Sequence, residues 1–236
     1  MSVPDERGDL DRMAQDVETK DCTALSDAEL EEMGNICAGG PASYDIGLLS
    51  KQREEWVLIT QARSNGVLQG FSFSTLERIG GTPSVLIGMA SIKRTAKRQE
   101  TLKAMVGDQL RRAVLAFPDE DVLIGTRFSD ASGFDAFTAY LELQEICPRP
   151  GHKPSGEDRA WGRRLAKRFG VDADYDERAF IATGDGSPAC VLDHESAKAD
   201  KISAEVKALF KEVNTAKGDS LVAFGWAMAE DLAKLA

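Results

Sequence analysis

An apolar segment reads Ser-Val-Leu-Ile-Gly-Met-Ala-Ser-Ile at 84–92 and leads directly into a basic one, Lys-Arg-Thr-Ala-Lys-Arg-Gln-Glu at 93–100. An amphipathic stretch continues to Phe117, and a second apolar segment, Asp-Val-Leu-Ile-Gly-Thr-Arg-Phe, follows at 121–128. Short apolar runs between turn residues are typical of buried strands, and the stretch between these two has the period of a helix. The sequence therefore predicts two parallel strands joined by a right-handed helical crossover, with cations where the first strand meets the helix.

Two further strand patterns precede this unit, at 56–62 and 67–79, with a Ser-Asn-Gly turn between them at 64–66. A Gly-Gly-Thr-Pro turn at 80–83 links the second pattern to the segment 84–92. Short turns of this composition join antiparallel neighbours. Three sequential antiparallel strands are therefore expected ahead of the parallel pair.

The N-terminal part divides into a polar segment and a helix. Residues 1–21 carry apolar side chains only at scattered positions, which predicts a flexible lead-in. Ser26 and Glu29 have the spacing of a capping box, in which each side chain bonds to the backbone N–H of the other residue. A helix is therefore expected over 27–37.

The C-terminal half predicts more helix than strand. Apolar spacing indicates a helix at 134–146, and the loop at 148–156 is so rich in Pro and Gly that it is the best internal boundary. We predict one α/β domain with a mixed sheet over 22–190, and a helical C-terminal extension over 191–236 that packs on the core. The other expected elements are a basic helix at 157–169, a strand at 178–183, and helices at 193–213 and 219–235.

The charge of the chain is negative overall and unevenly distributed. A net charge of −10 argues against general binding to nucleic acid or to an anionic membrane, because most of the surface would repel phosphates. Two segments are exceptions, 93–112 and 149–168, and each contains seven basic and two acidic residues. Local cations in an acidic protein favour a discrete anionic ligand.

Cysteine and histidine usage argues against a metal site. The four cysteines form no Cys-x-x-Cys pair, and the two histidines, His152 and His194, have no metal-ligand spacing. The N-terminus is too polar for a signal peptide, and no run approaches the roughly eighteen apolar residues of a membrane span. We therefore expect a cytoplasmic protein with reduced thiols, no metal and no membrane association.

The predicted order of helix, three antiparallel strands, helix, parallel strand and helix resembles that of the GNAT superfamily of acyl-CoA-dependent N-acyltransferases. The resemblance covers roughly 23–146 and depends on the element order and on the strand, loop and helix at 84–117. It implies a GNAT-like acyltransferase fold, acetyl-CoA or another acyl-CoA as co-substrate without a metal, and a small-molecule or peptide amine as acceptor. A homodimer is among the assemblies left open.

In that family, a loop of pattern Arg/Gln-x-x-Gly-x-Gly/Ala holds the pyrophosphate of the cofactor at a helix N-terminus. Here Glu100 and Leu102 stand in place of both glycines, so close backbone approach to phosphate is harder. Neighbouring cations would replace part of these contacts, and the alternative is a solvated helix N-terminus that binds nothing. The resemblance assigns cofactor contacts to Ala90, Ser91, Ile92, Lys97, Arg98, Gln99, Glu100, Thr101 and Leu102.

The fourth and fifth strands of the family splay apart, and the pantetheine arm of the cofactor pairs with the exposed backbone of the fourth. Gly88 and Gly125 lie at similar depth in the two matching strands of this chain. Glycine inside a strand often marks a bulge or a close approach by a neighbour. That neighbour is either a ligand or a packed helix, and the sequence does not decide between them.

The resemblance also suggests reacting groups. Tyr140 lies near the place where the family carries a tyrosine that protonates the leaving thiolate, and the alternative is a core or surface tyrosine. Glu77 is the nearest candidate for a base that acts through water, or else an exposed hairpin carboxylate. Arg159, Arg163 and Lys167 share one helix face, where they contact the adenosine 3′-phosphate, an acidic substrate or only solvent.

Two functions remain as hypotheses. The first is an acyl-CoA-dependent N-acyltransferase that transfers the acyl group directly to an amine, and the clustered cations favour it. The second is a catalytically silent GNAT-like protein that binds an anionic ligand or a protein partner through 149–235. The missing loop glycines favour the second.

Overall fold

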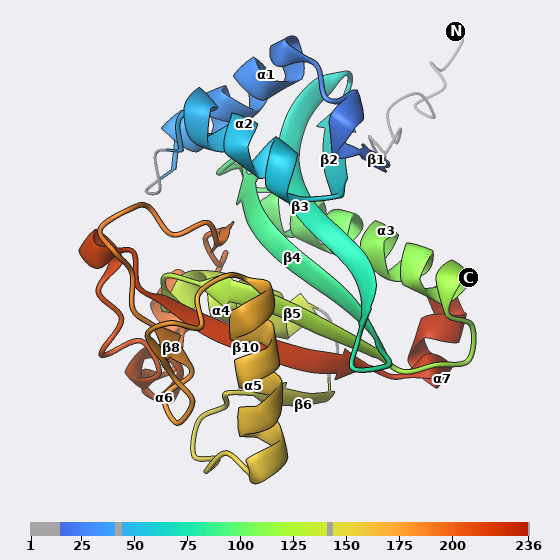
Figure 1. Ribbon diagram of the computed structural model, residues 1–236. Coiled ribbons are helices and arrows are strands. Elements are labelled where there is room, and N and C mark those ends of the chain that lie inside the picture. The colour runs from blue at the N-terminus through green and yellow to red at the C-terminus, as the bar shows by residue number, and fades with distance from the viewer. Residues whose placement is uncertain (1–14, 41–43, 141–143, 236) are drawn as a thin grey trace, which may run out of the picture.

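The structure is a computed structural model that describes residues 15–40, 44–140 and 144–235 (Figure 1). Its strands are β1 (Asp16–Asp21), β2 (Leu58–Ser64), β3 (Val67–Ile79), β4 (Thr82–Ile92), β5 (Val122–Phe128), β6 (Gln144–Cys147), β7 (Tyr175–Asp176), β8 (Ile181–Ala182), β9 (Leu192–Asp193) and β10 (Ser220–Ala227). Its α-helices are α1 (Asp27–Ala38), α2 (Ile46–Glu55), α3 (Arg98–Ala116), α4 (Ala131–Tyr140), α5 (Gly156–Arg168), α6 (Ala204–Ala208) and α7 (Ala229–Leu232). Short 3-10 helices lie at Cys22–Ala24, Ala199–Lys201, Thr215–Lys217 and Ala233–Leu235.

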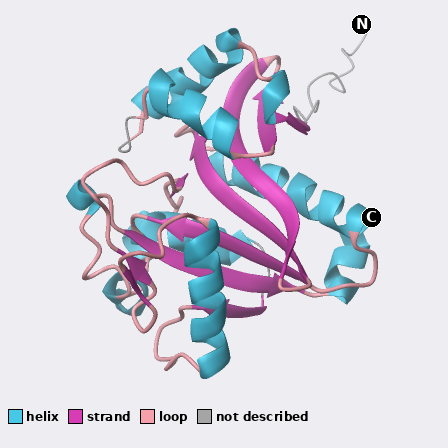
Figure 2. Cartoon of the chain, in the orientation of Figure 1, coloured by secondary structure: helices cyan, strands magenta, loops and turns pink. Residues whose placement is uncertain are grey.

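Within the described residues, the strands form one mixed sheet in the order β1-β2-β3-β4-β5-β10-β8-β7, with β6 paired to β10 and β9 paired to β4. Helices cover both faces of this sheet (Figure 2). Helices α3 and α4 pack on one face, and α1, α2 and α5 pack on the other. The main hydrophobic core surrounds β4, β5 and β10, and a smaller cluster lies between the two N-terminal helices and β2 to β4.

The predicted α/β class and the fold around the deciding segment are confirmed. Strands β2, β3 and β4 are antiparallel neighbours, and β4 runs parallel to β5 with α3 as the crossover between them. Apolar side chains of α3 such as Leu102, Met105 and Leu110 are buried in the main core, as helical spacing requires. The basic helix expected at 157–169 is present as α5. None of the described helices is long and apolar enough to cross a membrane.

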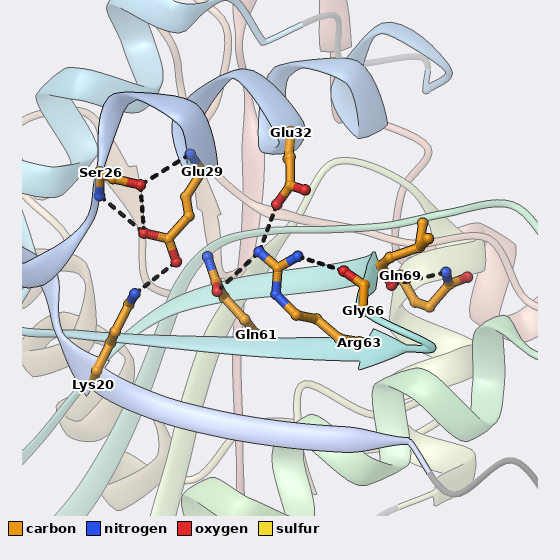
Figure 3. A network of polar contacts seen from close by, with 9 residues as sticks. Lys20, Ser26, Glu29, Glu32, Gln61, Arg63, Gly66 and Gln69 are labelled. Atoms are coloured by element: carbon orange, nitrogen blue, oxygen red, sulfur yellow. Dashed lines mark hydrogen bonds and ion pairs between the residues drawn. The ribbon is translucent and has the colours of Figure 1, made fainter.

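The predicted capping box at the start of α1 is confirmed, and it belongs to a polar network with the sheet (Figure 3). Glu29 accepts hydrogen bonds from the Ser26 N–H at 2.9 Å and from Lys20 of β1 at 2.6 Å. Arg63 of β2 donates to Glu32 of α1 at 2.5 Å. Burial raises the pKa of Glu29, but the bonds from Lys20 and Ser26 outweigh it and lower this pKa to about 2. The network holds α1 against β1 and β2.

The expectation of a flexible lead-in over 1–21 is wrong for its last part. Asp16–Asp21 forms β1, an edge strand antiparallel to β2. Thr19 is buried there, and its hydroxyl donates to Asp108 of α3 at 2.6 Å. Polar contacts hold this strand in place of a row of apolar side chains. Its sequence therefore lacks the apolar alternation that predicts a half-buried strand. Residues 1–14 lie outside the described part of the chain.

The segment 191–236 is not the helical extension that the sequence predicted. Ser220–Ala227 forms β10, which lies between β5 and β8. Most of β10 is buried, so its sequence is an almost continuous apolar run, and such a run fits a buried strand and a buried helix equally well. The helix expected at 193–213 is also largely absent, because α6 covers only Ala204–Ala208.

The helix expected at 134–146 is also shorter than predicted. Helix α4 is described as far as Tyr140, residues 141–143 of the predicted helix lie outside the described part of the chain, and Gln144–Cys147 forms β6, paired with β10. The late strand expected at 178–183 is present as the two-residue β8. Element type was hardest to assign from sequence where short strands follow a helix.

Candidate functional site

Strands β4 and β5 pair only over their first halves. The parallel register runs from Ser84↔Leu123 to Leu86↔Gly125 and stops there. Beyond this point, Gly88 and Met89 of β4 both lie opposite one residue of β3, which is the geometry of a β-bulge. A bulge bends its strand and increases the local twist, so β4 turns away from β5. The splay that the resemblance implied is therefore present.

The two strand glycines admit side chains of this chain. A Cβ atom on Gly88 would overlap the indole of Trp56, and one on Gly125 would lie 2.8 Å from Leu165 of α5. Of the two alternatives left open by the sequence, close packing by the protein itself accounts for both glycines.

A segment of the chain itself lies in the splay. Strand β9 runs parallel to β4, with Leu192 opposite Ala90 and Asp193 opposite Ser91. The Ala90 N–H donates to the Val191 carbonyl at 3.1 Å. Ala90 and Ser91 also pair with β3 on their other side, so β4 has a strand neighbour on both edges here. We call residues 191–196 the β9 segment.

Polar contacts hold the β9 segment to the end of β4. Asp193 is 4% exposed and accepts a bond from Arg94 at 2.6 Å and one from Ser91 at 3.2 Å. Burial raises the pKa of Asp193, and the Arg94 guanidinium opposes this rise. A buried carboxylate needs such a partner, because an unpaired charge in the interior costs several kcal/mol.

The end of the β9 segment contacts α3 and α4. Arg98 of α3 donates to the Glu195 carbonyl at 2.9 Å and to the Ser196 carbonyl at 3.3 Å. The Ser196 hydroxyl donates to Asp135 of α4 at 2.8 Å. His194, in the middle of the β9 segment, is 2% exposed. Burial and the nearby charges of Arg98 and Arg94 lower its pKa to about 4. The segment is thus fixed at both ends.

The first turn of α3 is where the sequence predicted phosphate contacts. Lys97 caps the helix without a side-chain hydrogen bond and is exposed, as is Glu100. Thr101 and Leu102 are buried, and the Thr101 hydroxyl donates to the Lys97 carbonyl at 3.2 Å. Gln99 is half-buried. Of the six residues at 97–102, two are therefore exposed, two are half-buried and two are buried.

Both arginines of the basic segment 93–100 form contacts within the chain. Arg94 pairs with Asp193, and Arg98 donates to carbonyls of the β9 segment. Cations at a helix N-terminus are unfavourable unless negative charge lies nearby. Here the Asp193 carboxylate and the carbonyl oxygens of the β9 segment supply part of that negative charge. Ile92 is buried and pairs with Gly70 of β3.

Two of the groups suggested by the resemblance form ion pairs within the chain, and the third, Tyr140, stays a prediction. Tyr140 is the last residue of α4, and its side chain lies outside what the structure describes. Glu77 binds Arg168 of α5 in an ion pair. Arg159 and Arg163 both pair with Glu177, so one carboxylate is shared between two cations of that basic face.

The β9 segment is the feature of this site that sequence reasoning missed. Its apolar part, Val191 and Leu192, is too short to predict a strand, and a polar Asp-His-Glu-Ser run follows it. The available signal was the basic segment at 93–112, whose buried partner is Asp193. Partners so far apart in sequence cannot be identified by local patterns.

Comparisons with known proteins find similarity only among solved structures. Neither a family model nor a curated protein sequence matches the chain. The ribosomal-protein-S18-alanine N-acetyltransferase from Escherichia coli is 13% identical over 60% of this chain and 86% of its own, with a TM-score of 0.40. An acetyltransferase from Bacillus subtilis, in complex with CoA, is 19% identical over 56% of this chain and 80% of its own, with a TM-score of 0.39. Aminoglycoside 6′-acetyltransferase type Ii is 9% identical over 56% of this chain and 86% of its own, with a TM-score of 0.41.

The names of these proteins describe them as acetyltransferases. At such identities and TM-scores, the likeness supports no statement about activity or substrate. The functional proposals therefore depend on the residues and contacts of this chain.

Proposed function

We propose that this chain is a catalytically silent GNAT-like protein that acts by binding and does not take up acyl-CoA. One observation carries the proposal: the β9 segment pairs with Ala90 and Ser91 of β4, where the resemblance places the pantetheine arm. A pantetheine arm and a protein strand compete for the same backbone edge. The absence of both loop glycines, with Glu100 and Leu102 in their places, supports the same reading.

The energy needed to open the splay is a large fraction of the binding free energy of a micromolar cofactor. Val191 and Leu192 are each 1% exposed, and Asp193 is in a buried ion pair. Exposing the two apolar side chains costs roughly 1.5–3 kcal/mol each, before the ion pair is counted. At about 1.4 kcal/mol per tenfold, this weakens a ligand that must displace the segment by two to four powers of ten. A micromolar site would become at best a submillimolar one.

Calorimetry and thermal unfolding with acetyl-CoA, longer acyl-CoA and free CoA test the proposal. We expect any dissociation constant to be weaker than about 0.1 mM, so that ligand at about 10 μM gives no heat of binding and no rise in melting temperature. A dissociation constant in the micromolar range for any of these ligands would contradict the proposal.

The second candidate is an acyl-CoA-dependent N-acyltransferase acting on a small-molecule or peptide amine, and the bulge and splay of β4 favour it. Lys97 and Arg98 would then contact the coenzyme phosphates, Tyr140 would be the candidate acid for the leaving thiolate, and the β9 segment would have to move. In that case, joint replacement of Lys97 and Arg98 by Ala should weaken CoA binding and reduce its salt dependence. Lys211→Ala, at an exposed residue in the C-terminal part of the chain, is the matched control.

A further inference from the structure

A buried arginine on β5 has no carboxylate partner. Arg127 is 8% exposed, and among the described residues no acidic side chain lies within ion-pair distance of it. Its guanidinium donates to the Cys190 carbonyl at 2.7 Å and to the Ser220 hydroxyl at 3.4 Å, and its buried Nε–H has no partner among the described residues. A guanidinium carries five N–H donors and a permanent positive charge, so most of its bonding capacity is unused.

Arg127 is among the residues that line a cavity of about 370 Å³ between the ends of α2 and α5 and the sheet. The centre of the guanidinium lies 5.4 Å from the Phe169 ring centroid, and Phe169 and Trp56 contact each other with ring centroids 6.2 Å apart. The cavity lies on the α5 face of the sheet, where Leu86 of β4 also lines it. We call it the Arg127 pocket.

The other charges of the Arg127 pocket do not neutralise Arg127. Arg168 also lines it, but its charge is used in the ion pair with Glu77. Glu55 lies at the exposed mouth, where its carboxylate accepts a bond from Gln52 at 2.7 Å. Within the described part of the chain, no carboxylate is paired with Arg127. Burial lowers the pKa of Arg127 because the charged form is desolvated, and the attraction of Glu55 opposes this fall.

We propose that the Arg127 pocket binds a small organic monocarboxylate, with the carboxylate on the Arg127 guanidinium and an apolar or aromatic part against Trp56 and Phe169. A planar guanidinium binds a carboxylate through two parallel N–H donors, and the aromatic walls exclude water from that pair. The volume is near the lower end of the range for ligand pockets, which limits the ligand to a small molecule. Glu55 at the mouth disfavours a second negative group.

The carboxylate would be the ligand of the binding role proposed above, so this inference rests on the proposed function. The two can nevertheless fail separately, because the β9 segment and the Arg127 pocket are tested with different ligands. Uptake of acyl-CoA would contradict the silent function and leave the carboxylate site standing. Failure to bind any carboxylate would contradict the carboxylate site and leave the silent function standing.

Benzoate is the probe, and benzamide is its neutral control of the same shape. We expect benzoate to raise the melting temperature and give a heat of binding at about 10 mM or below, and benzamide to give neither effect. Arg127→Gln should weaken benzoate binding about tenfold or more, because a charge-assisted pair is lost. Arg78→Gln, which removes an exposed arginine paired with Glu120, should leave binding unchanged.

A second variant covers the case in which Arg127→Gln does not fold. Val57 lines the mouth of the pocket and is 54% exposed, so its side chain can be changed without disturbing the core. Val57→Glu should weaken benzoate binding by charge repulsion, and Val57→Gln should not. The proposal is overturned if benzamide binds as well as benzoate, if benzoate does not bind, or if a folded Arg127→Gln variant binds it unchanged. Equal binding of inorganic phosphate would also overturn it, because the site would then select anions in general.

Discussion

Two arginines, the half-buried Arg94 and the buried Arg127, lie beyond the point where β4 and β5 part, and they differ in whether a carboxylate is paired with them. Arg94 follows β4 and is paired with Asp193 of the β9 segment. Arg127, on β5, is more deeply buried and binds only a carbonyl and a hydroxyl oxygen among the described residues. A charge that the fold neutralises is part of the structure, whereas one that it leaves unmatched is costly unless a ligand supplies the partner. We call the β9 segment and its contacts with the end of β4 the closed site, and the Arg127 pocket the open site.

The largest effect is expected where the charge is paired. Asp193→Asn should lower the free energy of unfolding by about 2–4 kcal/mol, because it leaves the Arg94 guanidinium without its carboxylate. Denaturant titration measures this loss. Glu120→Gln breaks the exposed ion pair with Arg78 and should cost at most about 1 kcal/mol. Equal losses for the two variants would show that the β9 segment is not held by a buried pair.

Gly88→Ala should disturb the open site and leave the closed one intact. The added Cβ would overlap the Trp56 indole, and overpacking of this kind typically costs about 1–3 kcal/mol. We expect weaker benzoate binding in this variant, since Trp56 lines the Arg127 pocket. Gly107→Ala, in α3 with open space around the new Cβ, is the control and should not destabilise the protein. Unchanged stability of Gly88→Ala would contradict the packing of Trp56 on β4.

His194 gives the closed site a pH dependence. Its pKa is lowered to about 4 in the folded protein by burial and the nearby arginines, against about 6.5 in the unfolded chain. Between these values the unfolded chain binds more protons, so the free energy of unfolding falls as pH is lowered, by about 2 kcal/mol at pH 5. His194→Leu should remove this part of the slope in unfolding experiments from pH 7 to pH 5. An identical slope in the variant would mean that His194 is not buried in its neutral form.

The smallest effect is expected where the charge is unmatched. Arg127→Met should change the free energy of unfolding of the ligand-free protein by less than about 1 kcal/mol, because loss of the bond to the Cys190 carbonyl is offset by removal of a buried unpaired charge. Denaturant titration alongside Asp193→Asn measures both variants under the same conditions. If Arg127→Met is the more damaging of the two, Arg127 is a structural residue and the distinction between the sites fails.

The parts of the fold that were predictable from sequence are those with local signals. The capping box of Ser26 and Glu29 fixed the start of α1, and the turns at 64–66 and 80–83 fixed the meander of β2, β3 and β4. Strand β5 was predictable because it is short, apolar and bounded by turn residues. In each case the pattern and the structure depend on residues a few positions apart.

The errors arose where distant partners decide the structure. Strand β10 is apolar on both faces because it lies inside the sheet between β5 and β8 and both of its faces are largely buried, and its composition fits a buried helix as well. The pairing of Asp193 with Arg94 joins positions 99 residues apart, so the cations at 93–98 could be assigned to an anion but not to this one. Arg127 looked like an ordinary strand residue, because its lack of a partner is visible only in three dimensions.

Hydrogen exchange at the Ala90 amide tests the central claim most directly, since this N–H donates to Val191 of the β9 segment at 3.1 Å. We predict that nuclear magnetic resonance will find this amide protected in the ligand-free protein, and that acetyl-CoA at about 1 mM will not alter its exchange rate. An amide that exchanges freely in the ligand-free protein and becomes protected only when acetyl-CoA is added would contradict the account. It would show that the edge of β4 is open and belongs to the cofactor.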